Sequence, residues 1–117
     1  MPSRFGVGAC GPIDLDHLGK MTLSDSALER EVLLLFVEQT AKLMRTLASV
    51  PDDAVTLAHT LKGSARAIGA FGVAEAAAAL EAALQANSGA REAIMRLDAE
   101  VEQARQAAAM LLARSEP

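Results

Sequence analysis

Apolar residues recur every three or four positions along most of this chain, which is the periodicity of helices buried on one face. No segment alternates apolar and polar residues with a period of two, as a half-buried strand would. Breaks at Pro51, Gly69 and Gly89 interrupt the helical pattern. The periodicity predicts an all-α protein. The breaks predict that its chain folds back on itself repeatedly.

We expect four long helices joined by short connections, closed as an antiparallel four-helix bundle with a short extra N-terminal helix. The first long helix begins near Ser24 to Ser26, where Ser26 and Glu29 form a capping-box pattern, and it ends before Pro51. The short helix begins near Ile13 and is ended by Gly19. The remaining long helices are expected at about 52–68, 73–86 and 90–111.

The apolar stripes also predict the core. An extended coiled coil that dimerises is an alternative to the bundle, but the three breaks in the pattern disfavour it. The residues assigned to the core include Leu35, the rings of Phe36 and Phe71, and the gap-filling Met44, Met95 and Met110.

The 117 residues allow one domain, which we place at 13–114 after a flexible arm at 1–12. A net charge of −4 and only 3% aromatic residues argue against nucleic-acid binding. No apolar run approaches the roughly 20 residues that span a bilayer, and the N-terminus lacks a signal pattern. With the single cysteine, Cys10, these features predict a cytoplasmic protein that does not bind membranes.

His59 lies on the second expected long helix. At about 100° per residue, Ala54, Ala58, Leu61 and Ala65 mark the core side, and His59 points roughly 150° away from them. The helix geometry predicts an imidazole held out into solvent on a rigid support.

Three features set this histidine apart from an ordinary surface residue, and one of them is the extra hydroxyl donor of Ser64 near the same turn. No carboxylate occurs between Asp53 and Glu75, so we expect a locally positive surface that favours an anion. Gly63 lies one turn after His59, inside a helix, where glycine costs about 1 kcal/mol relative to alanine. Its missing side chain would clear a path for another molecule to approach the ring.

The segment 58–65, Ala-His-Thr-Leu-Lys-Gly-Ser-Ala, resembles the active-site segment of histidine-containing phosphotransfer (HPt) domains of bacterial two-component phosphorelays. The following Ile-Gly-Ala-Phe-Gly-Val at 68–73 and the Ala-, Leu- and Glu-rich helix after it are also similar to that family. The resemblance covers about residues 13–113, and the His-x-x-Lys-Gly-Ser pattern on the second long helix is its most specific part.

The resemblance implies a role for each matching residue. His59 would accept the phosphoryl group on a ring nitrogen, and Lys62 would lie beside the phosphoryl oxygens and offset their charge. Gly63 would leave room for the partner, and Ser64 would orient the site by hydrogen bonding.

Three further residues are candidates for partner docking or support. Arg66 replaces the small residue that is more usual in the family, and we interpret it as an additional positive charge or docking contact. Gln39 would reach the site from the first long helix. Val55 is the third candidate in this group.

The implied partners are a response-regulator receiver domain, which supplies the aspartate and Mg²⁺, and a sensor or hybrid histidine kinase. The chain has no glycine-rich nucleotide loop and no plausible carboxylate cluster for Mg²⁺ and ATP, so we expect no cofactor or metal of its own. It would be a phosphoryl carrier and not a turnover enzyme.

Two simpler interpretations stay open. The same bundle could be an adaptor or dimerisation module without phosphorylation. His17, the other histidine, is flanked by Asp14 and Asp16, which disfavour a phosphoryl group, and we interpret it as a capping or packing residue. A metal site formed by His17 and His59 is weaker still, because they lie on separate elements.

Overall fold

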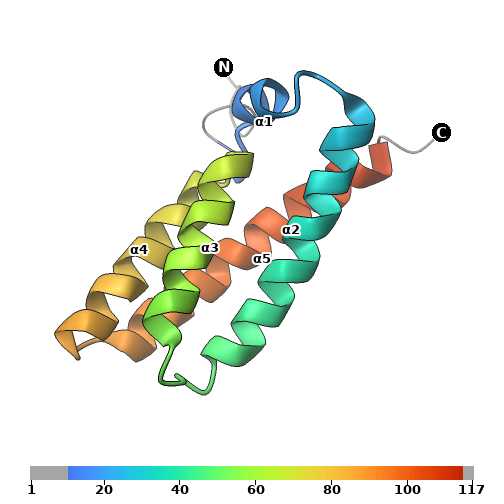
Figure 1. Cartoon of the computed structure of the whole chain (residues 1–117). Coiled ribbons are helices and arrows are strands. Elements are labelled where there is room, and N and C mark those ends of the chain that lie inside the picture. Colours follow the sequence, from blue (N-terminus) through green and yellow to red (C-terminus); the bar gives the residue numbers. More distant parts are fainter. Residues whose placement is uncertain (1–10, 115–117) are drawn as a thin grey trace.

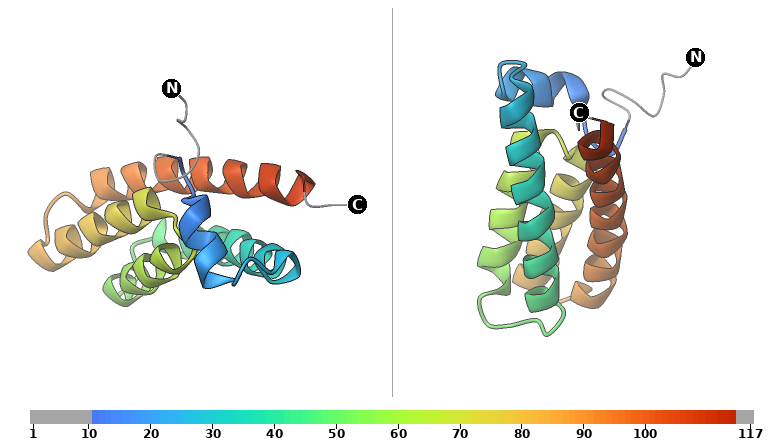
Figure 2. Two further views of the ribbon diagram at one scale, coloured as in Figure 1. Left: turned by 90° about the horizontal axis from the view of Figure 1, so that it is seen from above. Right: turned by 90° about the vertical axis from the view of Figure 1, so that its right-hand side faces the viewer.

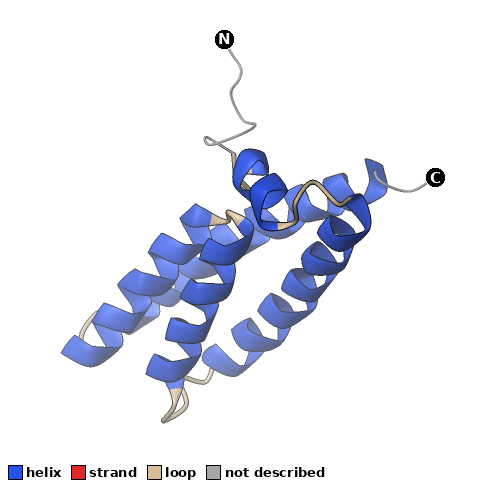
Figure 3. Cartoon of the chain, turned by 45° about the horizontal axis from the view of Figure 1, so that its top comes forward, coloured by secondary structure: helices blue, strands red, loops and turns tan. Residues whose placement is uncertain are grey.

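Five helices follow one another along residues 11–114, the part of the chain that this computed structural model describes (Figure 1). No strand occurs within these residues, so the all-α prediction is confirmed (Figure 3). The predicted arm lies almost wholly outside the described residues, as does Cys10. The helices are α1 (Leu15–Met21), α2 (Ser26–Leu47), α3 (Ala54–Ile68), α4 (Phe71–Ala86) and α5 (Ala90–Arg114).

The four long helices form the predicted antiparallel bundle (Figure 1). Each long helix contacts the next along the chain, and α2 also contacts α5, which closes the arrangement. The short α1 lies across one end of the bundle and contacts α3 (Figure 2). The chain therefore folds back between the long helices and does not form an extended coiled coil.

The start of α2 differs from the capping-box prediction. Asp25 is the N-cap residue, and its carboxylate accepts a hydrogen bond from the backbone N–H of Leu28 at 3.1 Å. Ser26 is the first helical residue and not the cap. An ionised carboxylate suits this position because it interacts with the positive end of the helix as well as with the N–H group.

The boundaries of α1 and α4 also differ from expectation. α1 continues through Gly19 because Thr22 completes its last turn, donating its N–H and its hydroxyl to the carbonyl of Leu18 at 3.0 and 2.8 Å. α4 begins at Phe71, earlier than expected, because the chain reverses within two residues. The backbone N–H of Ala70 already donates to the carbonyl of Ala65 at 2.8 Å.

Gly69 ends α3 in the left-handed conformation, with φ of 87°, as the glycine cap predicted from the sequence. Its carbonyl accepts a hydrogen bond from the N–H of Asp14 at 2.8 Å, which joins the start of α1 to the turn between α3 and α4. A Cβ atom at Gly69 would lie 2.8 Å from the carbonyl oxygen of Asp14. The turn therefore requires glycine both for its conformation and for this close approach.

Small residues line the contact between α3 and α4, the most extensive helix contact in the bundle. Alanine lets two helix backbones approach more closely than leucine would, while large leucines fill the centre of the bundle. The buried alanines of the two helices are Ala54, Ala58, Ala65, Ala74, Ala76 and Ala77, and the largest buried side chains include Leu18, Leu47, Leu61, Leu80 and Leu97.

The predicted core is only partly correct. Phe36 is buried, and Met44 packs against the core from a half-buried position. Leu35, Phe71, Met95 and Met110 are exposed, so their assignment to the core was wrong. Helix periodicity identifies an apolar stripe but not which parts of it a neighbouring helix covers; α2, which carries Leu35, has α3 and α5 as its main packing partners among the described residues.

Replacing Gly69 by alanine is expected to lower the free energy of unfolding by about 1–3 kcal/mol, because alanine resists the left-handed conformation. Urea denaturation measures this change. Gly63→Ala is the matched control, since a Cβ atom there has no neighbour within 4 Å. It is expected to raise stability by about 0.5–1 kcal/mol, as alanine is the better helix former. Equal stability of Gly69→Ala and the wild-type protein would contradict this account.

Candidate functional site

The third helix presents His59 to solvent as predicted. Ala58, Leu61 and Ala65 are buried on the core side of α3, while 66% of the His59 side chain is exposed. The backbone beneath the ring is the interior of a helix packed against α2 and α4. The imidazole is thus accessible, and the backbone that carries it is fixed.

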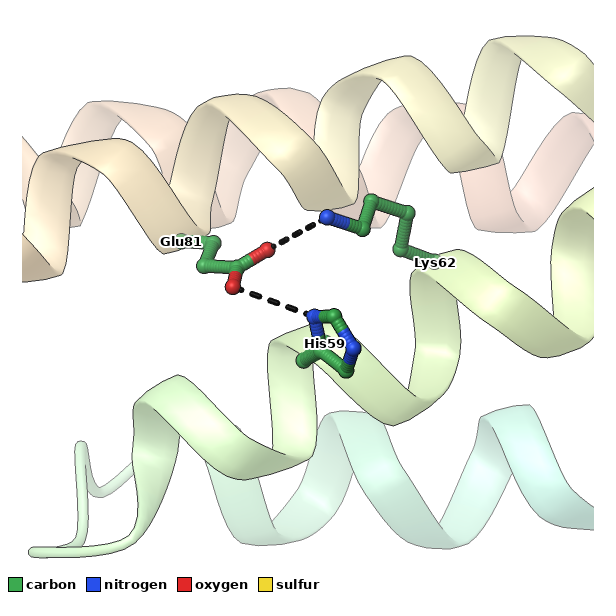
Figure 4. Close-up of polar contacts among 3 residues, drawn as sticks. All are labelled: His59, Lys62 and Glu81. Atoms are coloured by element: carbon green, nitrogen blue, oxygen red, sulfur yellow. Dashed lines mark hydrogen bonds and ion pairs between the residues drawn. The ribbon is translucent and has the colours of Figure 1, made fainter.

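A carboxylate from the neighbouring helix lies between His59 and Lys62 (Figure 4). Oε2 of Glu81 lies 3.1 Å from Nδ1 of His59, and its Oε1 accepts a hydrogen bond from Nζ of Lys62 at 2.8 Å. Glu81 and Lys62 are largely covered, with 17% and 20% of their side chains exposed. The three side chains therefore form one connected group, with only the ring of His59 largely in water.

Glu81 corrects the electrostatic prediction. A locally positive surface was expected because no carboxylate lies near His59 along the chain, but α4 brings one into direct contact. The hydrogen bond from Lys62 is the largest influence that holds the pKa of Glu81 below its ordinary value of 4.5, and the contact with His59 acts in the same direction. Glu81 is therefore ionised at neutral pH and offsets the charge of Lys62.

Sequence reasoning missed Glu81, although the sequence contains a signal for it. An antiparallel helix pair brings together residues that are equally far from the turn that joins the helices. His59 and Glu81 are at equal separation from Ala70, which lies in the turn between α3 and α4. Placing the turn at Gly69 and Ala70, and beginning the next helix before residue 73, would have identified the pair.

Gly63 leaves open space one turn after His59. It is exposed, and a Cβ atom built on it would have no neighbour within 4 Å. No packing contact therefore requires glycine at this position of α3. This geometry agrees with the interpretation that Gly63 leaves space for another molecule to approach the ring of His59.

Ser64 and Gln39 lie together, and neither takes part in the contact between His59 and Glu81. Both line a groove between α2 and α3, with Leu35 and Ala67 at its sides. In the part of the chain that the structure describes, neither side chain hydrogen-bonds to His59. The structure thus brings Gln39 to α3 beside Ser64, without a hydrogen bond to the imidazole among the described residues.

The remaining candidates occupy other parts of α3. Arg66 is exposed near the C-terminal end of the helix, whereas Val55 is half-buried in its first turn. His17 is half-buried on α1, where its ring packs edge-on against Phe71 with the ring centroids 5.2 Å apart. That contact agrees with the interpretation of His17 as a packing residue.

Residues 11–114 contain neither a cluster of metal ligands nor a membrane-spanning helix. No group of three or more His, Cys, Asp or Glu residues in this range is arranged to hold a metal ion. No helix in the same range is both long and apolar enough to cross a membrane.

Comparison with known proteins identifies the family of this chain. Residues 31–107 match the family model of the Hpt domain, and the match includes the whole of α3 and α4. Because it spans well over half of the chain, the protein belongs to the Hpt domain family, whose members are phosphotransfer modules. Searches of curated proteins and of solved structures found no match.

Glu81→Gln is expected to lower the stability of the protein at neutral pH but not in acid. The pKa of Glu81 is lower in the folded protein than its ordinary 4.5, so its ionised form contributes stability that is lost as the pH falls through the folded-state pKa. The melting temperatures of the variant and the wild type should therefore differ at neutral pH and converge well below pH 4.5.

Glu75→Gln is the matched control for this pH series. Glu75 is exposed on the same helix and has no charged partner among the described residues, so its substitution should leave the melting temperature unchanged throughout. A difference between Glu81→Gln and the wild type that persists undiminished in acid would refute the assigned ionisation.

Proposed function

We propose that this protein accepts a phosphoryl group on His59 and exchanges it with the aspartate of a response-regulator receiver domain. The observation that carries the proposal is the largely exposed imidazole on the rigid helix α3, in a chain that belongs to the Hpt domain family. His17 lacks these properties, because it is half-buried and its Nε2 atom is enclosed and has no hydrogen-bond partner among residues 11–114.

The chemistry needs a nucleophile in line with the leaving group and positive charge near the phosphoryl oxygens. A neutral imidazole is a suitable nucleophile near physiological pH. The ammonium group of Lys62 lies one turn along the helix and contacts the same carboxylate as the ring. It is close enough to His59 to offset part of the charge of an attached phosphoryl group.

The other reactants would come from partner proteins. We propose that the receiver domain supplies the aspartate and Mg²⁺ and that a sensor or hybrid histidine kinase supplies phosphate to the relay, so that this protein acts as a carrier and not as an enzyme. We also propose that the protein is located in the cytoplasm, because such partners would meet it there.

The partner would approach the exposed side of α3. Gly63 leaves the space beside His59 free, and Arg66 offers an exposed positive charge further along the helix. The groove that contains Ser64 and Gln39 adjoins the same helix and is bordered by the exposed Leu35. We assign these residues, with Val55, to the docking or support of the partner.

His59→Gln is expected to abolish phosphorylation by a phosphorylated receiver domain. The measurement is transfer of labelled phosphate to the protein, with the acid lability and base stability of the product as the sign of phosphohistidine. His17→Gln is the matched control and should keep the label at the wild-type level. Labelling that persists in His59→Gln and disappears in His17→Gln would move the site to α1.

Gly63→Leu is expected to slow phosphoryl transfer while leaving the fold intact, because a bulky side chain would fill the approach to His59. We expect the transfer rate to fall by about tenfold or more, as misplaced reacting groups cost rates of that order. Stopped or quenched time courses measure the rate, and circular dichroism checks the fold. Transfer at the wild-type rate would show that the open space has no role in the encounter.

A further inference from the structure

We propose that Arg66 is a specificity-determining residue, which selects a receiver domain that carries a carboxylate opposite the C-terminal half of α3. This inference rests on the proposed exchange of phosphate between His59 and a receiver domain. It goes beyond the assignment of Arg66 to partner docking, because it states which chemical group the partner must present and which receivers the protein should refuse.

Arg66 lies on the same exposed stripe of α3 as His59. The two residues are seven positions apart, so they differ in direction by only about 20° and are separated by about 10 Å along the helix axis. Gly63 lies between them and leaves open space, since a Cβ atom there would have no neighbour within 4 Å. Both Arg66 and His59 are exposed. A partner that reaches the ring of His59 therefore also faces Arg66.

The guanidinium group of Arg66 is available to a partner. Its side chain makes no hydrogen bond or ion pair with any residue in the range 11–114. The neighbouring cation of α3, Lys62, is engaged by Glu81, and α3 itself contains no carboxylate. A guanidinium group can form two parallel hydrogen bonds with one carboxylate, so this is the group that Arg66 would recognise best on a partner.

Two carboxylates on α2 restrict where acidic groups of the partner can lie. Leu35 borders the groove between α2 and α3, and Glu31 and Glu38 are its exposed neighbours one turn away on α2. An acidic group placed over this part of α2 would be repelled, in a chain whose net charge is already −4. Attraction at Arg66 and repulsion over α2 together define where the partner's carboxylate must lie, and specific interfaces commonly use both.

The position of Arg66 near the end of α3 allows a simpler role, because a cation in the last turn interacts favourably with the negative end of a helix. That interaction would stabilise the fold but would not distinguish between partners. Arg45 is the matched control, since it is exposed in the last turn of α2. It lies about 120° around that helix from Gln39, which lines the groove.

Transfer of phosphate to variants of Arg66 tests the selection. The probe is the receiver domain, among those encoded in the same genome, that phosphorylates the wild-type protein at the lowest concentration after its own phosphorylation by acetyl phosphate. We expect the receiver concentration at half the maximal transfer rate to rise about twofold to fivefold in Arg66→Gln. In Arg66→Glu it should rise roughly tenfold or more, because like charges then meet. The effect should lie in this concentration and not in the maximal rate, and Arg45→Glu should keep the wild-type value.

Lysine substitutions on the receiver identify the carboxylate. Each exposed Asp or Glu around its phosphorylation site is replaced in turn by lysine, and transfer to the wild type and to Arg66→Glu is measured. We expect one of these receivers to transfer poorly to the wild type and to need a concentration lower by about threefold or more with Arg66→Glu, because two charges reversed together attract again. Arg45→Glu should not restore transfer from this receiver.

Melting temperatures and circular dichroism check the fold of each variant, and Arg66→Gln carries the test if Arg66→Glu does not fold. Wild-type transfer in the folded variants of Arg66, or no recovery with any lysine receiver, would overturn the inference while leaving His59 as the accepting residue. Equal losses in Arg66→Glu and Arg45→Glu would assign both arginines to their helix ends and would also overturn it. A wild-type protein that no receiver phosphorylates on His59 would contradict the proposed function itself.

Discussion

The close packing of α3 against α4 is the constraint on which the rest of the site depends. Buried alanines bring the two helices together, and the left-handed Gly69 reverses the chain within a very short turn. With this separation and register, Glu81 reaches both His59 and Lys62. Larger residues at the contact would move α4 outwards and break the group, although every residue of α3 would keep its place on the helix.

This packing gives the site a charge distribution that α3 alone would not have. Without Glu81, a cation and an imidazole would stand side by side on an exposed helix. The carboxylate of Glu81 pairs with Lys62 and contacts the ring, yet His59 remains largely open to solvent. The site therefore combines a fixed electrostatic environment on the protein side with free access on the partner side, which suits a group that receives a charged ligand and releases it again.

Helix periodicity and chain breaks were sufficient to predict the fold, because each depends on residues close in sequence. They gave the four long helices, the cap at Gly69 and the outward direction of His59. They could not give the exposure of Leu35 or Met95, which depends on how many helices pack against each side. Glu81 was missed because its contact with α3 depends on the exact turn between α3 and α4, and a start of α4 at residue 73 places that turn too late.

Mass spectrometric mapping of the wild-type protein after transfer from a phosphorylated receiver tests the central claim most directly. The digest must be kept alkaline so that phosphohistidine survives. The account predicts a single phosphoryl group, located on the peptide that contains His59. A phosphoryl group on His17, on Ser64 or on a carboxylate would contradict it.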